Sequence, residues 1–141
     1  MNSKDREYWI QKAIEQAKLN ETPFGAIIVD PEGRHVGAYN TTSKDGPAAH
    51  AEINVIQLMS QLDVEDPRAL TLYSTVEPCP MCMSAIVWAG IGQVVFGASI
   101  DDAANFGKQL HISSKQIAEL AWYPIQVEGG VLKDECKRLF T

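Results

Sequence analysis

Two short motifs in the chain contain residues that bind metal ions. The first is His50-Ala-Glu52 and the second is Pro78-Cys-Pro-Met-Cys82. Cysteines three positions apart share a face of a helix, and a helix start stabilises negative charge, so both sulfurs can be thiolates directed at one point. Two thiolates and a neutral imidazole suit Zn²⁺ and leave the fourth tetrahedral position for water, as in a catalytic site. The sequence therefore predicts zinc bound by His50, Cys79 and Cys82.

Glu52 is the only ionisable residue in a long uncharged stretch after His50. A buried carboxylate beside an activated water can take a proton from that water and return it to a substrate. Residues two apart in the middle of a helix do not share a face, so this role requires His50 to lie at the very start of its helix. On that condition, Glu52 is predicted to be the catalytic proton shuttle.

Other functions remain open for the cysteines. Taken alone, Cys79-x-x-Cys82 is also typical of a thioredoxin-like redox protein. Cys136 would complete a closed zinc site and make the chain a structural-zinc binding module. We favour the catalytic site because His50 and Glu52 accompany the pair, whereas Cys136 lies among charged residues of a terminal helix, where a half-buried thiol is ordinary.

The elements that must position these residues alternate between helix and strand. Apolar spacing predicts an amphipathic helix over residues 4–19, and turn residues around 31–33 predict a hairpin between two strands. A helix is expected to begin near His50, with its charge-free part, residues 53–62, enclosed by neighbours. Further strands are expected at 69–75, 94–98 and 124–128, and further helices at 80–90, 113–120 and 131–140. The order predicts a three-layer α/β/α fold with a central five-stranded mixed sheet.

The composition is that of an ordinary soluble protein. With 141 residues, 45% hydrophobic and 21% charged, residues 1–141 are expected to form a single domain. The first thirty residues contain no apolar block typical of a signal peptide, and no stretch is long enough to span a bilayer. Three cysteines make a poor disulfide framework and suit a reducing compartment. We therefore expect a cytoplasmic protein without a membrane partner.

The charge distribution bears on the partner. The net charge is −6, and between Asp45 and Gly107 the only lysine or arginine is Arg68. A phosphate backbone passing this segment would find little positive charge to neutralise it. A small-molecule substrate is therefore expected rather than a nucleic acid.

The two metal-binding motifs make the chain resemble the cytidine deaminase-like superfamily of zinc deaminases. The similarity extends from Pro23-Phe-Gly-Ala26 to the ending Gly130-Val-Leu-Lys-Asp-Glu-Cys136. It implies a zinc-dependent hydrolase of cyclic amidines that replaces an amino group on a nucleobase-like ring by oxygen from water. It also implies a homodimer.

Two branches of this superfamily share motifs with the chain. The segments Pro23-Phe-Gly-Ala26, Glu77-Pro-Cys-Pro-Met-Cys82 and 101–107 resemble bacterial guanine deaminases, whereas 94–98 and 130–136 resemble tRNA adenosine deaminases. The charge argument disfavours tRNA, and segments 23–25 and 101–107 favour the guanine deaminase branch, so we expect guanine, converted to xanthine and ammonia, with adenosine in tRNA as the alternative. The resemblance further implies substrate-binding roles for Asn40, Phe24, Ala51 and either Asp101 or Asp102.

Overall fold

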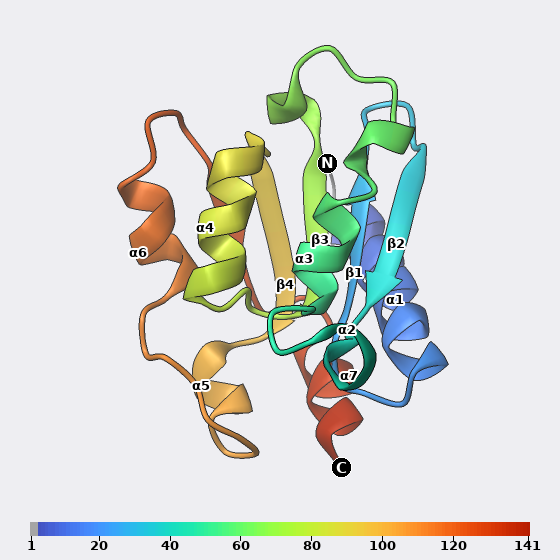
Figure 1. The fold of residues 1–141 in the computed structure, drawn as a ribbon, viewed down its shortest axis with the longest axis vertical. Coiled ribbons are helices and arrows are strands. Elements are labelled where there is room, and N and C mark those ends of the chain that lie inside the picture. The colour runs from blue at the N-terminus through green and yellow to red at the C-terminus, as the bar shows by residue number, and fades with distance from the viewer. Residues whose placement is uncertain (1–2) are drawn as a thin grey trace.

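The computed structural model describes residues 3–141, which form a five-stranded sheet with helices on both faces (Figure 1). The strand order is β2-β1-β3-β4-β5. Strand β1 (Gly25–Val29) pairs antiparallel with β2 (His35–Tyr39) and with β3 (Thr71–Val76). Strands β4 (Gln93–Ala98) and β5 (Gln126–Glu128) continue the sheet in parallel. The predicted mixed α/β sheet is confirmed.

Alternating side chains of the strands build two separate cores. Ala26 and Ile28 of β1 pack on one face, while Ile27 and Val29 pack on the other, as expected for a strand buried on both sides. Helices α3 (Ala51–Ile56), α4 (Pro80–Ala89) and α6 (Ser114–Glu119) lie over the first face. Helices α1 (Ser3–Leu19) and α7 (Lys133–Lys137) lie over the second (Figure 1).

Helix α1 lies unusually close to the sheet. A Cβ atom at Gly25 would overlap the carbonyl oxygen of Ala13 and lie 2.6 Å from the backbone nitrogen of Ala17. Only a residue without a side chain fits between this strand and this helix. The backbone contact fixes the position of β1, whose first residues adjoin the candidate site.

The lengths of several helices differ from the expectation. The charge-free stretch 53–62 is not one enclosed helix, because α3 ends at Ile56 and a 3-10 turn, Met59–Gln61, follows with exposed polar side chains. The terminal helix begins only at Lys133, after Leu132 in a left-handed conformation (φ 51°), and ends in a 3-10 turn, Arg138–Phe140. Two short helices, α2 (Thr42–Asp45) and α5 (Ile100–Ala103), were not predicted.

One end of the sheet gathers the motifs. Strands β2 and β3 both run antiparallel to β1 and β4 is parallel to β3, so these three strands end at the same side. Helices α3, α4 and α5 begin at that side, at the bottom of the view in Figure 1. Open α/β sheets bind ligands outside the carboxyl ends of their strands. Within residues 3–141, no helix has both the length and the apolar composition needed to cross a membrane.

Candidate functional site

Each metal-binding motif places its first ligand at the start of a helix. His50 is the N-cap of α3, with φ −69° and ψ 157°, and Cys79 is the N-cap of α4, with φ −65° and ψ 169°. Pro80 occupies the first turn of α4, where its missing N–H costs nothing. His50 therefore lies at the very start of its helix, as its two-residue spacing from Glu52 requires.

The three predicted ligands meet at one point. Nδ1 of His50 lies 3.7 Å from Sγ of Cys79 and 3.5 Å from Sγ of Cys82, and all three atoms lie within 4.8 Å of one another. Tetrahedral zinc with Zn–S of about 2.3 Å and Zn–N of about 2.0–2.1 Å separates such atoms by about 3.6 Å. The donor set and its spacing therefore fit zinc.

The two thiols share a proton. The pKa of Cys79 is lowered to about 4, chiefly because the Cys82 thiol hydrogen-bonds to it and further because His50 does. The same hydrogen bond, together with burial, raises the pKa of Cys82. The Cys79 sulfur also raises the pKa of His50. One thiolate is thus ready to bind a cation, whose binding would displace the remaining proton.

Glu52 lies beside these ligands in a nearly closed environment. Its side chain is 5% exposed, and loss of hydration raises its pKa to about 7, with a further increase from the negative charge of Cys79. A carboxyl group with this pKa can both accept and release a proton near pH 7. The arrangement is that of a general acid and base next to a metal site.

Two connected cavities open onto the ligands. The inner cavity, about 190 Å³, is lined by Phe24, Asn40, His50, Glu52, Val76, Glu77, Cys79, Lys108 and Gln109. The outer cavity, about 770 Å³, shares His50, Cys79, Lys108 and Gln109 with it and also contacts Met81 and Leu110. Pockets for drug-sized ligands occupy roughly 300–1,000 Å³. The inner cavity is therefore suited to a single ring system, and the outer cavity has room for a larger group.

Asn40 presents a defined hydrogen-bonding group to the inner cavity. Its Oδ1 accepts hydrogen bonds from the backbone N–H of Thr42 at 3.0 Å and from the Thr42 hydroxyl at 2.9 Å. These bonds fix which end of the amide is oxygen. Among the described residues, no side-chain hydrogen bond engages the Nδ2 group, so it is the donor that this cavity-lining residue can offer.

The two predicted aspartates do not line either cavity. Asp102 forms a capping box with Ser99 and lies within 3.5 Å of the Lys133 ammonium. The exposed Asp101 carboxylate lies 3.7 Å from Nδ1 of His111. Ala51 is buried in the first turn of α3 and is not part of the cavity lining either.

Lys108 and Gln109 reach the cavities instead, although sequence reasoning did not single them out. They follow the segment 101–107 that resembles guanine deaminases. No motif in the sequence marks them. Their proximity to the site depends on how the loop between α5 and α6 folds back.

Cys136 is far from this group. It is buried on α7 against the opposite face of the sheet, where its sulfur occupies the space that a Cβ atom at Gly97 would need. Among the described residues, the cluster that could hold a metal contains only His50, Cys79 and Cys82. Cys136 therefore does not supply a fourth ligand.

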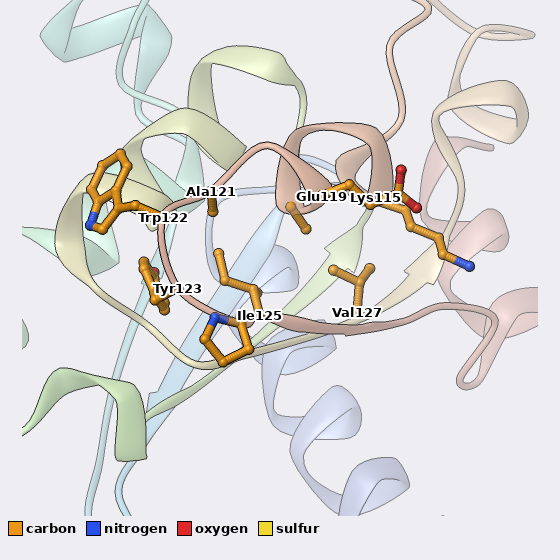
Figure 2. A pocket seen from close by; sticks show the side chains of 9 residues that line it. Lys115, Glu119, Ala121, Trp122, Tyr123, Ile125 and Val127 are labelled. Atoms are coloured by element: carbon orange, nitrogen blue, oxygen red, sulfur yellow. The ribbon is translucent and has the colours of Figure 1, made fainter.

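A further cavity of about 550 Å³ lies between α6 and β5, where Figure 2 shows Lys115, Glu119 and Trp122 around Ile125 and Val127. It contains none of the predicted site residues. The chemistry therefore belongs to the two cavities at the metal ligands.

Comparison with known proteins agrees with this geometry. Residues 3–98 match a family model described as the cytidine and deoxycytidylate deaminase zinc-binding region. A protein named "Probable cytosine deaminase" from Schizosaccharomyces pombe is 32% identical over 96% of this chain and 89% of its own length. A tRNA-specific adenosine deaminase from Haemophilus influenzae is 32% identical over 97% of this chain and 79% of its own length.

A solved structure of a guanine deaminase from Nitrosomonas europaea superposes with a TM-score of 0.81 at 27% identity, covering 95% of this chain and 81% of that one. With the matched family region containing His50, Cys79 and Cys82, zinc is the metal for which these residues are positioned. The chain belongs to the cytidine and deoxycytidylate deaminase zinc-binding family.

Proposed function

We propose that the protein is a zinc-dependent hydrolytic deaminase of a free nucleobase or a similarly small aminated heterocycle, with guanine as the preferred candidate. The observation that carries the proposal is the buried Glu52 carboxyl beside three zinc ligands, in a cavity of about 190 Å³. For guanine, the reaction consumes water and yields xanthine and ammonia. Zinc, when bound, supplies a water of lowered pKa.

The residues of the chain supply the remaining chemistry. Glu52 accepts the proton of the attacking water and then delivers protons to the ring nitrogen and to the departing amine. The Nδ2 group of Asn40 donates a hydrogen bond to an acceptor on the ring, and Phe24 forms part of the apolar wall. The small cavity limits the access of bulk water, which strengthens these polar interactions.

The charge around the site favours a small substrate over tRNA. Among the described residues, Lys108 is the only lysine or arginine that lines either cavity. The guanidinium of Arg68 lies 4.9 Å from the centre of the Tyr123 ring, away from both cavities. Enzymes that act on RNA obtain much of their affinity from phosphate contacts, which need several such cations.

Adenosine in tRNA is the second candidate. The outer cavity has room for groups attached to a base, and the H. influenzae relative carries the name of a tRNA-specific adenosine deaminase. The lysines of α7, Lys133 and Lys137, are partly engaged by the Asp102 carboxylate, which reduces the positive charge that they offer to phosphate.

An ammonia-release assay separates these candidates. The zinc-loaded protein is incubated with free guanine, adenine and cytosine, with their nucleosides, and with a tRNA anticodon stem-loop. We expect turnover of a free base. Conversion of adenosine to inosine in the stem-loop, without turnover of any free base, would contradict the proposal.

We also propose that the protein is a cytoplasmic homodimer, as the family resemblance and a set of three cysteines suited to a reducing compartment suggest. The surface bears a pair of aromatic side chains, Trp88 and Trp122, which are 79% and 63% exposed and contact each other edge to face at 5.0 Å. Such side chains are enriched in protein interfaces. Sedimentation equilibrium at micromolar concentration would test the dimer, and a monomer mass would contradict it.

A further inference from the structure

A buried carboxylate next to the metal-binding motif holds two distant parts of the chain. Glu77 is 8% exposed. Its Oε1 accepts a hydrogen bond from the backbone N–H of Ile100 at 2.9 Å. Its Oε2 accepts two, from the backbone N–H of Ser114 at 2.8 Å and from the Ser114 hydroxyl at 2.7 Å. Both carboxylate oxygens are therefore used within the protein.

The two partners of Glu77 stand at the ends of one segment, residues 101–113. Ile100 begins α5 and Ser114 begins α6, so the intervening chain contains the rest of α5 and the loop that joins the two helices in Figure 1. This segment contains Lys108 and Gln109, which line both cavities. One side chain thus hydrogen-bonds to both ends of the segment that forms this part of the pocket wall.

The middle of the segment is held by one aromatic contact that is partly exposed to solvent. The Phe106 ring, half exposed, stacks on Phe140 at 4.9 Å, and Phe140 contacts Phe24 of the inner cavity edge to face at 5.7 Å. No hydrogen bond or ion pair within the described residues engages the side chains of Lys108 or Gln109. Their placement therefore depends on how firmly the two ends of the segment are held.

Glu77 is also close in sequence to a metal ligand. It lies two residues before Cys79, and its backbone N–H donates to the carbonyl oxygen of Ala98 at 2.7 Å. No ion pair between described residues involves Glu77, so its burial is offset by hydrogen bonds alone. Hydrogen bonds to a charged acceptor are short and roughly twice as strong as neutral ones, and a buried charge without them is costly.

We propose that Glu77 is a positioning residue of the deaminase site, which holds segment 101–113 so that Lys108 and Gln109 form the substrate wall beside the metal ligands. The inference rests on the proposed deaminase function. Glu77 itself borders the inner cavity, but both of its carboxylate oxygens are engaged within the protein, so its loss is expected to affect the wall and substrate binding more than the chemical step.

The test is Glu77→Gln in the zinc-loaded protein. The amide keeps the size of the side chain, but its NH₂ group cannot accept a hydrogen bond, so it faces a donor from Ile100 or Ser114. We expect about one zinc per chain, KM raised by about tenfold, kcat within about threefold of wild type, and faster amide hydrogen exchange over residues 100–114. Ser114→Ala, which removes only the hydroxyl donor, should raise KM by about two- to threefold.

Ser113→Ala is the matched control. The Ser113 hydroxyl caps the same helix start by accepting from the N–H of Gln116 at 3.1 Å, but it does not contact Glu77. The variant should lower the melting temperature to a similar extent as Ser114→Ala while leaving KM and the exchange of residues 101–112 unchanged. An equal rise in KM for both serine variants would show a merely structural role and overturn the proposal.

Other results are equally decisive. Unchanged KM and unchanged exchange in Glu77→Gln would overturn the proposal, as would loss of zinc with normal exchange of the segment. If Glu77→Gln does not fold, Ser114→Ala decides by the same two measurements. Hydrogen exchange needs no substrate, so a wild-type protein that deaminates nothing in the panel would refute the proposed function while the exchange result still shows whether Glu77 holds the segment.

Discussion

At the scale of single residues, catalysis depends on the ionisation of Glu52. Loss of hydration raises the pKa of Glu52 to about 7, and a bound divalent cation lowers it towards the ordinary carboxyl value. As a base, Glu52 acts only when deprotonated. The value of kcat/KM should therefore fall as the pH decreases through the pKa that Glu52 has in the metal-loaded protein. We expect the acidic limb of the pH profile of kcat/KM between pH 4.5 and 7. A flat profile across that window would assign the proton transfer to another group.

Replacement of Glu52 tests the same role directly. Glu52→Gln preserves the volume of a buried side chain but removes the base. We expect a folded protein with about one zinc per chain and a kcat lower by about 10²- to 10⁴-fold. Metal analysis and steady-state kinetics on the same preparation provide the measurement. Turnover within severalfold of wild type would exclude Glu52 as the proton shuttle.

The metal site is tested by its buried ligand. Cys82→Ala removes one of three donors, so zinc content and activity should be lost together. Cys136→Ala is the matched control, because this buried thiol lies on the opposite face of the sheet. It should retain zinc. Equal loss of zinc from both variants would indicate a four-ligand structural site.

Local geometry explains which site residues the sequence could predict. His50, Cys79 and Cys82 owe their positions to helix starts, and helix starts are encoded by short-range spacing. Lys108 and Gln109 reach the site only through the path of a long loop. Asp101 and Asp102 were expected at the substrate, but the capping box with Ser99 directs Asp102 to the helix start and towards Lys133. The spacing Ser99-x-x-Asp102 was a signal for that helix start, whereas the path of the loop that carries Lys108 and Gln109 has no such local signal.

At the scale of elements, the close contact between α1 and β1 has a measurable effect. Gly25→Ala would force a methyl group into the backbone of the helix around Ala13 and Ala17. We expect a decrease in the free energy of unfolding of about 1–3 kcal/mol or more, measured by urea denaturation. Gly107→Ala is the control, because nothing lies within 4 Å of its added Cβ. Equal stability of Gly25→Ala and wild type would mean that α1 can shift away from the sheet.

Sequence patterns were sufficient to predict the strands but not the short helices. All five strands were predicted close to their observed positions, because short apolar runs bounded by turn residues mark most of them, and β1 and β3 are buried along their whole length. The short helices α2 and α5, with four residues each, carry no periodic signal. Stretch 53–62 lacks charge but is not fully enclosed, since glutamine and serine side chains there meet water. Absence of charge was therefore not a measure of burial.

At the scale of the whole molecule, the response of activity to salt distinguishes an uncharged base from a substrate that is bound through its phosphates. A free base carries no phosphate, so kcat/KM for guanine should change by less than about twofold between 50 and 200 mM salt. Recognition of tRNA through several phosphates would weaken by about 10³-fold or more over that range. Assays of guanine and the stem-loop at both salt concentrations provide the comparison. A steep salt dependence of base turnover would contradict a substrate held by neutral contacts.

The parts of the site are also synthesised in a fixed order along the chain. All three zinc ligands lie within the first 82 residues, whereas the second partner of Glu77 is Ser114. During synthesis, at about 5–20 residues per second, the ligands leave the ribosome well before the segment that forms the substrate wall is complete. Parallel pairing of β4 with β5 also closes late, since it joins segments separated by a long crossover. Because a domain of this size folds as one cooperative unit, we expect the ligands, although they are made first, to bind metal only after the sheet that positions α3 and α4 has formed.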